Sequence, residues 1–264
     1  MTWYTGDPTY DGVLTAGLVF AALVLLVGPF VQSPYGRFAS ERFGVALDPR
    51  LGWFLMELPA TLSFLWFFFD GPRCFEPVPL VFLGIWLVHY GNRGWFFPWS
   101  IRSPRGARAS FSLMVMVTGW FVTTTHGYLH ASFFSRFGGH YDLGWFDDPR
   151  FRIGFVIYAG SLALNIHSDA IIRRLRTREE VAAGVKVYRI PRGGLFRWVT
   201  SPNYLTELTA WAGLAICSWS LASVFILAVS LGNLVPRALA THRWYKARFP
   251  EYPRERKALV PFVV

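Results

Sequence analysis

The chain has 264 residues, of which 53% are apolar, 18% are aromatic and only 16% are charged. An average soluble domain carries about 25% charged residues, so this chain has too few charges to cover the surface of a water-soluble globule. The same composition excludes a disordered chain, and two cysteines are too few for a disulfide framework or a cysteine-based zinc site. A lipid bilayer is therefore the expected environment.

Seven stretches poor in charge are each long enough, at about 20 residues, to cross the hydrocarbon core as a helix. In chain order they cover residues 12–32, 51–69, 77–97, 110–134, 151–172, 203–219 and 221–240. The first has neither the basic leader nor the cleavage site of a signal peptide, so it is predicted to be a retained helix. The last two are joined tightly at 218–220, as in a helical hairpin. The sequence thus predicts a single all-α domain, residues 1–264, with seven transmembrane helices.

The basic residues predict how these helices are oriented. One side of the predicted membrane has only four of them, Arg73, Arg136, Arg150 and Arg152, and every other Lys and Arg lies in the alternate segments on the opposite side. The positive-inside rule then places the N-terminus outside and the C-terminus in the cytoplasm. The chain is expected to be a multi-pass membrane protein, in the endoplasmic reticulum of a eukaryote or the plasma membrane of a bacterium.

The net charge of +10 is concentrated on the predicted cytoplasmic side, in 173–202 and from Arg237 onward. Anionic lipid headgroups could account for this excess. These segments also contain Tyr and Glu, and Asp169 and Asn203 lie just outside the first of them. This mixture suits a polar ligand better than a flat membrane surface. Nucleic acid is not an expected partner, because the basic segments are short and bounded by apolar spans.

Four groups stand out inside the predicted spans: Glu57, Tyr90, Asp169 and Glu207. An ionisable group within a membrane is costly unless it is paired or faces water, so each carboxylate is a functional candidate. Each carboxylate could instead have a structural role. Glu57 could pair with a nearby arginine, Asp169 could pair with Arg173 one turn later, and Glu207 could favour the N-terminal end of its helix.

Metal and classical nucleotide sites are not expected. His126 and His130 lie one helical turn apart in HGYLH, but the six histidines of the chain are scattered over several regions. A structural or ligand-lining role is expected for this pair. The chain has neither GxGxxG nor a P-loop motif, so a nucleotide would have to be held by side chains of the helices and cytoplasmic loops.

Several long segments resemble the membrane steroid 5α-reductases, the 3-oxo-5α-steroid 4-dehydrogenases. NIHSDAIIRRLR at 165–176 is similar to one family segment, and YRIPRGGLF with the run that follows it to 221 is similar to a second. The stretch 242–264 resembles the C-terminal signature of the family, while WFLMELP at 53–59 and the His-Tyr pair at 89–90 match shorter motifs. These motifs occur in the order found in the family.

The resemblance implies an NADPH-dependent reduction of the C4–C5 double bond of a 3-oxo-Δ4-steroid, giving the 5α product by hydride transfer to C5. It implies that Glu57 and Tyr90 are catalytic and contact the 3-oxo group, with Trp53 beside them in the substrate site. A hydrogen-bond donor at that oxygen stabilises the enolate that develops as hydride arrives. The steroid would reach its pocket, in about 1–134, from the bilayer.

The resemblance also implies an NADPH site in about 150–264, where arginines bind phosphates in a bidentate manner. The residues expected to hold the cofactor are Asn165, Asp169, Arg173, Arg176, Tyr188, Asn203, Glu207, Tyr245 and Arg256. Further candidates, from loops that align less clearly, are Arg93, Arg105 and Arg150. The protein is expected to act as a monomer surrounded by membrane lipids.

Three departures from the family pattern bear on substrate choice: Met56 stands where a polar residue is frequent, Gly91 and Asn92 replace bulkier residues, and Thr241 replaces a histidine. The substrate could therefore be a non-steroid enone or a polyprenol lipid. Two further functions compete with reduction, namely a membrane methyltransferase of the isoprenylcysteine or phospholipid type and a non-enzymatic binder of sterols. Glu57 and Tyr90 favour the reductase, because methyl transfer to an exposed nucleophile needs neither.

Overall fold

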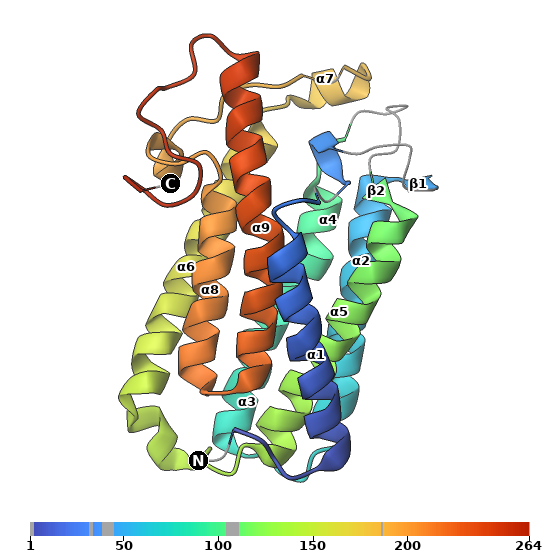
Figure 1. Cartoon of the computed structure of the whole chain (residues 1–264), viewed down its shortest axis with the longest axis vertical. Helices are drawn as coiled ribbons and strands as arrows, with labels where there is room; N and C mark the ends of the chain where they lie inside the picture. Colours follow the sequence, from blue (N-terminus) through green and yellow to red (C-terminus); the bar gives the residue numbers. More distant parts are fainter. Residues whose placement is uncertain (1–2, 32–33, 39–44, 104–110, 186, 264) are drawn as a thin grey trace.

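The computed structural model describes residues 3–31, 34–38, 45–103, 111–185 and 187–263. Long helices lie side by side in an elongated bundle, and the loops that carry most of the basic residues gather at one end (Figure 1). The long helices are α1 (Pro8–Val27), α2 (Pro49–Phe69), α3 (Pro77–Tyr90), α5 (Leu113–Ser132), α6 (Pro149–Arg174), α8 (Pro202–Ser218) and α9 (Leu221–Arg248). The short elements are α4 (Phe97–Ser100), α7 (Arg178–Ala182), and the strands β1 (Ala46–Leu47) and β2 (Phe111–Ser112), which pair antiparallel.

The all-α prediction is confirmed, and a helix covers most of each predicted span. Four helices of the described chain, α1, α2, α6 and α9, are long and apolar enough to cross a membrane by length and composition. The helices α3 and α8 have 14 and 17 residues, which is short for a span. The count of seven spans and the orientation of the termini therefore stay predictions.

Three of these long helices begin at an Asp-Pro pair, at 7–8, 48–49 and 148–149. In each, the aspartate carboxylate accepts a hydrogen bond from a backbone N–H of the first turn. Proline at the first helical position loses nothing, since its missing N–H would have no partner there. The sequence therefore sets the start of α1, α2 and α6 locally.

The helices α6 and α8 approach so closely that only glycine fits at their crossing. A Cβ atom on Gly154 would lie 2.3 Å from the backbone nitrogen of Cys217, and one on Gly213 would lie 2.6 Å from the backbone nitrogen of Tyr158. Small residues at a helix crossing allow backbone contact, which is a main source of helix association in a membrane. This crossing holds α6 beside α8, which together carry much of the polar site described below.

We expect Gly154→Ala to destabilise the protein by about 1–3 kcal/mol, because the added methyl group overpacks this crossing. The matched control is Gly160→Ala on the same helix, where a Cβ would meet nothing within 4 Å and alanine is the better helix former. Thermal unfolding in detergent measures both variants. Equal melting temperatures for the two would show that the crossing does not limit stability.

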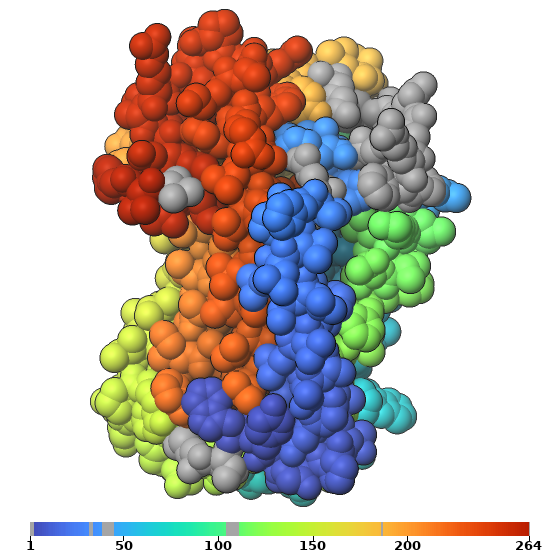
Figure 2. Space-filling view, in the orientation of Figure 1, coloured from blue at the N-terminus to red at the C-terminus, as the bar shows by residue number. Residues whose placement is uncertain are grey.

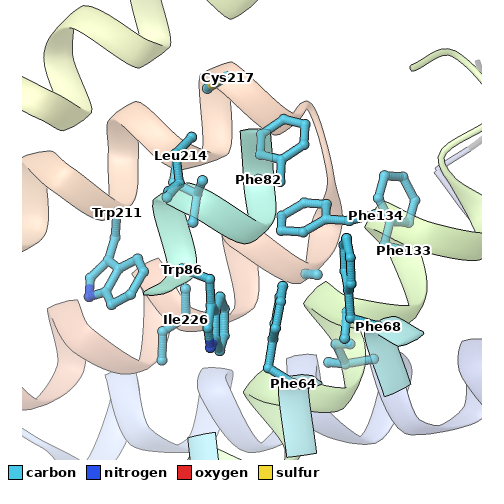
Figure 3. Packing of buried hydrophobic residues seen from close by; sticks show 14 of the residues in the cluster. Phe64, Phe68, Phe82, Trp86, Phe133, Phe134, Trp211, Leu214, Cys217 and Ile226 are labelled. Atoms are coloured by element: carbon cyan, nitrogen blue, oxygen red, sulfur yellow. The ribbon is translucent and has the colours of Figure 1, made fainter. Parts of the chain in front are cut away.

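Aromatic rings fill the centre of the bundle between α2, α3 and the end of α5 (Figure 3). Trp86 stacks on Phe64 with ring centroids 4.1 Å apart, and Phe82 stacks on Phe134 at 4.4 Å. His130 lies beside these rings, fully buried, and its Nδ1 donates to the His126 carbonyl at 2.9 Å while its Nε2 accepts from the Ser223 hydroxyl at 3.1 Å. His130 therefore has a structural role in joining α5 to α9.

Candidate functional site

An apolar cavity of about 580 Å³ lies between α1, α2, α5 and α9 and reaches the ends of α3 and α8. On the face shown in Figure 2, α1 lies between α9 and α5. Residues of α1 form part of the cavity wall. The volume of the cavity falls within the range of small-molecule sites. Residues from both 1–134 and 150–264 line this cavity. The division of the chain into a substrate-binding part and a cofactor-binding part therefore stays a prediction.

Glu57 and Tyr90 lie on the inner wall of this cavity and are 8% and 4% exposed. Among the described residues, neither side chain has a hydrogen-bond partner. Such groups are costly in an apolar environment unless a ligand satisfies them. The two side chains are therefore available to a polar group of a molecule inside the cavity.

Pro59 shapes the backbone next to Glu57. Because proline has no N–H, the carbonyl of Leu55 lacks its usual helical donor. The indole nitrogen of Trp120 on α5 donates to that carbonyl at 2.6 Å, and the hydroxyl of Thr123 donates to the carbonyl of Met56 at 3.1 Å. These bonds from α5 fix the turn of α2 that carries Glu57.

Directly after Tyr90 the helix widens into a π-helical turn, Gly91–Phe96, before it continues as α4. This turn places the guanidinium of Arg93 between two buried carboxylates. Its Nη1 lies 3.9 Å from Oδ2 of Asp169, and its Nε lies 4.0 Å from Oε1 of Glu207. The guanidinium also lies 5.3 Å from the ring centroid of Trp53. The π-helical turn thus brings α3, α6 and α8 together around one positive charge.

Glu207 is held from a second side. The amide nitrogen of Asn165 donates to Oε2 of Glu207 at 3.2 Å and to the backbone carbonyl of Asn203 at 2.8 Å. Nε2 of His89 lies 3.8 Å from Oε1 of Glu207, and its Nδ1 lies 3.1 Å from the hydroxyl of Tyr158. Glu207 therefore lies at the centre of a buried polar network with limited freedom to move.

A second cavity, of about 320 Å³, opens beside this cluster and is rich in arginine. It is lined by the end of α6, the start of α8, the upper part of α9 and the loop around Tyr35. The arginines in its wall are Arg37, Arg93, Arg102, Arg173, Arg176, Arg189 and Arg237. Guanidinium groups bind phosphates with two parallel hydrogen bonds, so this cavity suits a phosphorylated ligand.

The two cavities share three wall residues, Tyr35, Trp53 and Arg93. Tyr35 is held by Arg237, whose guanidinium lies 3.6 Å from the ring centroid and whose Nη2 donates to the Tyr35 carbonyl at 3.0 Å. Trp53 meets the Tyr35 ring edge to face at 5.6 Å. A polar ligand in one cavity can therefore meet an apolar ligand in the other at these three side chains.

The chain is similar to the proteins of one known family. The sequence profile of the family described as 3-oxo-5-alpha-steroid 4-dehydrogenase matches residues 109–264. The chain is 36% identical over 251 residues to 3-oxo-5-alpha-steroid 4-dehydrogenase 1 of Rattus norvegicus, which covers 93% of this chain and 92% of the relative. It is 35% identical over 248 residues to steroid 5-alpha-reductase DET2 of Solanum lycopersicum, with 93% of each covered.

The chain belongs to the steroid 5α-reductase family. This confirms the resemblance found in the sequence and decides against a methyltransferase. A third relative, steroid 5-alpha-reductase DET2 of Arabidopsis thaliana, is 35% identical over 264 residues and is covered over 98% of its length. The similarity thus extends over nearly the whole chain, including the helices that carry Glu57 and Tyr90.

Most of the residues predicted for the cofactor in this reductase-family chain lie together. The wall of the arginine-rich cavity contains Arg93, Asp169, Arg173, Arg176, Tyr188, Asn203 and Tyr245. Asn165 and Glu207 lie just behind it in the hydrogen-bond network described above. Arg105 lies outside the described residues. Three buried polar atoms of this wall have no hydrogen-bond partner among the described residues, namely Nη1 of Arg37, Oδ2 of Asp169 and Oγ of Ser201, and these are expected to bind a ligand.

Arg176 binds backbone carbonyls. Its Nη1 donates to the carbonyl of Arg102 at 3.0 Å and its Nε to that of Val187 at 3.1 Å, while Arg102 donates back to the carbonyl of Arg176. Nearby, Arg189 pairs with Glu180, and this contact lowers the pKa of the Glu180 carboxyl to about 2. The contacts of Arg176 and Arg189 hold the segment after α6 in place beside the cavity.

Arg150 and Arg256 lie outside the cavity wall. Arg150 is at the start of α6, 19 residues before Asp169, which places it about 28 Å away along the helix. It pairs with Asp148 at 2.6 Å and stacks on Trp145. Arg256 is buried and its guanidinium lies 5.1 Å from the ring centroid of Tyr252. The structure therefore does not bring Arg150 to the predicted cofactor site.

Sequence reasoning missed four arginines in the wall of the arginine-rich cavity, namely Arg37, Arg102, Arg189 and Arg237. It also missed Tyr35 at the junction and His89 in the wall of the apolar cavity. The rule that ionisable groups in spans are functional candidates could have found His89 and Arg237. Nothing in the local pattern marks Tyr35, because its place depends on how the loop after α1 folds back over α9.

Proposed function

We propose that the chain catalyses the NADPH-dependent reduction of the C4–C5 double bond of 3-oxo-Δ4-steroids to 5α-reduced 3-oxosteroids. The observation that carries the proposal is the junction at Tyr35, Trp53 and Arg93 between an apolar cavity bearing Glu57 and Tyr90 and an arginine-rich cavity. Membership of the steroid 5α-reductase family supports the reaction class.

The donor set of the polar cavity fits NADPH. The wall contains several guanidinium groups, such as those of Arg173 and Arg37, that could bind a diphosphate and a 2′-phosphate. Nη1 of Arg37 has no hydrogen-bond partner among the described residues. Oδ2 of Asp169 lies 3.9 Å from Nη1 of Arg93 and accepts no hydrogen bond from a described residue, so it offers an acceptor for an amide or a ribose hydroxyl. When bound, NADPH supplies the hydride that reduces C5.

Tyr90 and Glu57 act on the substrate. The hydroxyl of Tyr90 donates a hydrogen bond to the 3-oxo group, and the bond strengthens as negative charge grows on that oxygen. Glu57 either donates a second hydrogen bond in its protonated form or orients the phenol. The apolar walls exclude water, and this strengthens both interactions. A proton delivered to C4 completes the reduction.

We further propose that the substrate reaches the cavity from the bilayer and that one chain suffices for the reaction. Residues of α1 and α5 that line the cavity, such as Leu23 and Met114, are about half exposed on the side of the bundle. Both cavities are formed within one chain. Surrounding lipids would cover the exposed apolar side chains, as in a multi-pass membrane protein.

The test uses the purified protein in detergent with progesterone and NADPH deuterated at the transferable position. We expect the product to gain one deuterium at C5, on the α face, and one hydrogen at C4. We also expect turnover with NADH to be much slower. No mass gain with any 3-oxo-Δ4-steroid, under conditions where NADPH binding is measurable, would move the reaction to another enone or polyprenol lipid. Absence of NADPH binding would contradict the reductase proposal itself.

A further inference from the structure

Polar atoms are distributed unevenly around the apolar cavity. Glu57, Tyr90 and Glu207 lie together on the inner wall, formed by α2, α3 and α8. The opposite walls, formed by α1 and the facing sides of α5 and α9, consist mainly of Val, Leu, Ile, Phe and Met side chains. A ligand in this cavity therefore meets hydrogen-bonding groups at one of its ends and hydrocarbon along the rest.

The hydroxyl groups that α5 contributes to the lining are already satisfied. Thr118 donates to the carbonyl of Met114 at 2.9 Å. The hydroxyl of Thr123 shares its one proton between the carbonyl of Gly119 at 2.9 Å and that of Met56 at 3.1 Å.

On α9, the polar side chain of Asn233 lies beside Tyr35 and interacts with it. Within the described lining of these walls, Ser230 of α9 is the remaining hydroxyl. His126 of α5 also lines the cavity, and its ring nitrogens have no hydrogen-bond partner among the described residues. It lies at the inner end of that lining, with its ring centroid 6.0 Å from that of Tyr90. Away from this inner end, the walls of α1, α5 and α9 offer little to a polar substituent.

The same side of the cavity is open toward the exterior of the bundle. Leu23, Val27 and Met114 line the cavity and are 54%, 48% and 50% exposed. The lining of α5 extends from Met114 to His126, which corresponds to about 18 Å along the helix axis. A substituent at the far end of the ligand can therefore pass between α1 and α5 into the surrounding hydrocarbon.

We propose that this cavity selects 3-oxo-Δ4 enones whose far end is a hydrocarbon side chain over those that end in a hydroxyl or carbonyl group. The selection rests on the proposed function, since it concerns the substrate of the same site. A terminal hydroxyl would lose its hydrogen bonds to water or headgroups without gaining protein partners. An alkyl side chain would instead contact Phe20, Val24 and Val122 and continue into the bilayer.

The test is an internal competition in vesicles that contain the protein, NADPH and two substrates at equal mole fraction in the membrane. The pair is cholest-4-en-3-one, which ends in a branched alkyl chain, and testosterone, which ends in a hydroxyl. We expect the ratio of kcat/KM values to favour cholest-4-en-3-one by about tenfold, which corresponds to about 1.4 kcal/mol. Mass spectrometry of the two reduced products gives this ratio directly.

A variant of α1 and its control test whether the hydrocarbon wall causes this substrate preference. Val24 is half-buried on α1 and lines the cavity, whereas Val19 on the same helix is 57% exposed and lies outside the lining. Val24→Asn places an amide on the hydrocarbon side, so we expect it to shift the ratio toward testosterone. Val19→Asn should leave the ratio unchanged, although both variants introduce the same amide on α1.

A ratio near one or in favour of testosterone, with both substrates reduced, would overturn the proposal and leave the proposed function intact. If Ser230→Ala then lost the preference for testosterone, the partner of the testosterone hydroxyl would be Ser230. An unchanged ratio in Val24→Asn would also contradict the assignment of the hydrocarbon wall. Reduction of neither substrate, despite NADPH binding, would count against the proposed function instead.

Discussion

Tyr90→Phe is expected to lower kcat by about 10²–10³-fold, which is the usual effect of removing one donor from a developing oxyanion. The phenol ring would stay in place, because it packs against Trp86 with centroids 4.8 Å apart and makes no hydrogen bond to a described residue. The affinity for NADPH should be unchanged, since Tyr90 lines the apolar cavity and is absent from the wall of the arginine-rich one. Single-turnover oxidation of NADPH and equilibrium binding measure the two quantities separately.

Tyr10→Phe is the matched control. Tyr10 is equally buried, and its hydroxyl donates to the carbonyl of Leu129 at 3.1 Å, far along the bundle from Glu57. Loss of that bond should lower stability by about 1 kcal/mol and leave kcat unchanged. Normal turnover by Tyr90→Phe would show that the Tyr90 hydroxyl has no catalytic role. A collapse of NADPH affinity with turnover preserved would assign it to the cofactor site.

The helices could be predicted because their signals are local. Stretches of apolar residues and Asp-Pro starts mark α1, α2 and α6 without knowledge of the fold. The π-helical turn Gly91–Phe96 could not be predicted, because no local pattern of residues distinguishes a wider turn from an ordinary helical one, although Asn92 and Arg93 interrupt the apolar span there. That turn nevertheless sets the position of Arg93 and hence the centre of the site.

The candidate site could be predicted where the physical cost is visible in the sequence. Glu57, Asp169 and Glu207 stand out because a carboxylate inside an apolar span needs a partner, and all three lie near Arg93 in the structure. The arginines of the loops carry no such signal, since a basic residue in a cytoplasmic loop is ordinary. Which of them face the cavity depends on tertiary contacts, such as those that bring Arg37 over Trp244 at 4.7 Å and leave Arg150 at the opposite end of α6.

Arg93→Leu is expected to have the largest effect on the integrity of the site. Asp169 and Glu207 are 9% and 8% exposed, and both would lose the guanidinium that lies within 4.0 Å of each. Removing one partner of a buried ion pair costs about 3–5 kcal/mol, because the remaining charge is left without compensation. Thermal unfolding in detergent, with and without NADPH, should show a lower melting temperature and a weaker stabilisation by the cofactor.

Arg152→Leu is the control for the loss of an arginine from an ion pair. Arg152 pairs with Asp147 at the surface, with side chains 63% and 78% exposed, and such pairs contribute about 1 kcal/mol or less. A melting temperature for Arg93→Leu as high as that for Arg152→Leu would contradict the role of Arg93 as the shared counter-ion.

The double variant Arg93→Leu with Asp169→Asn separates charge compensation from simple loss of packing. If the uncompensated carboxylate causes the destabilisation, neutralising Asp169 should recover part of the stability lost in Arg93→Leu, so that the two changes are not additive. If Arg93 contributes only through its contacts with Trp53 and Phe97, the losses should add. Non-additivity would establish Arg93 as the charge around which α3, α6 and α8 assemble the junction of the two cavities.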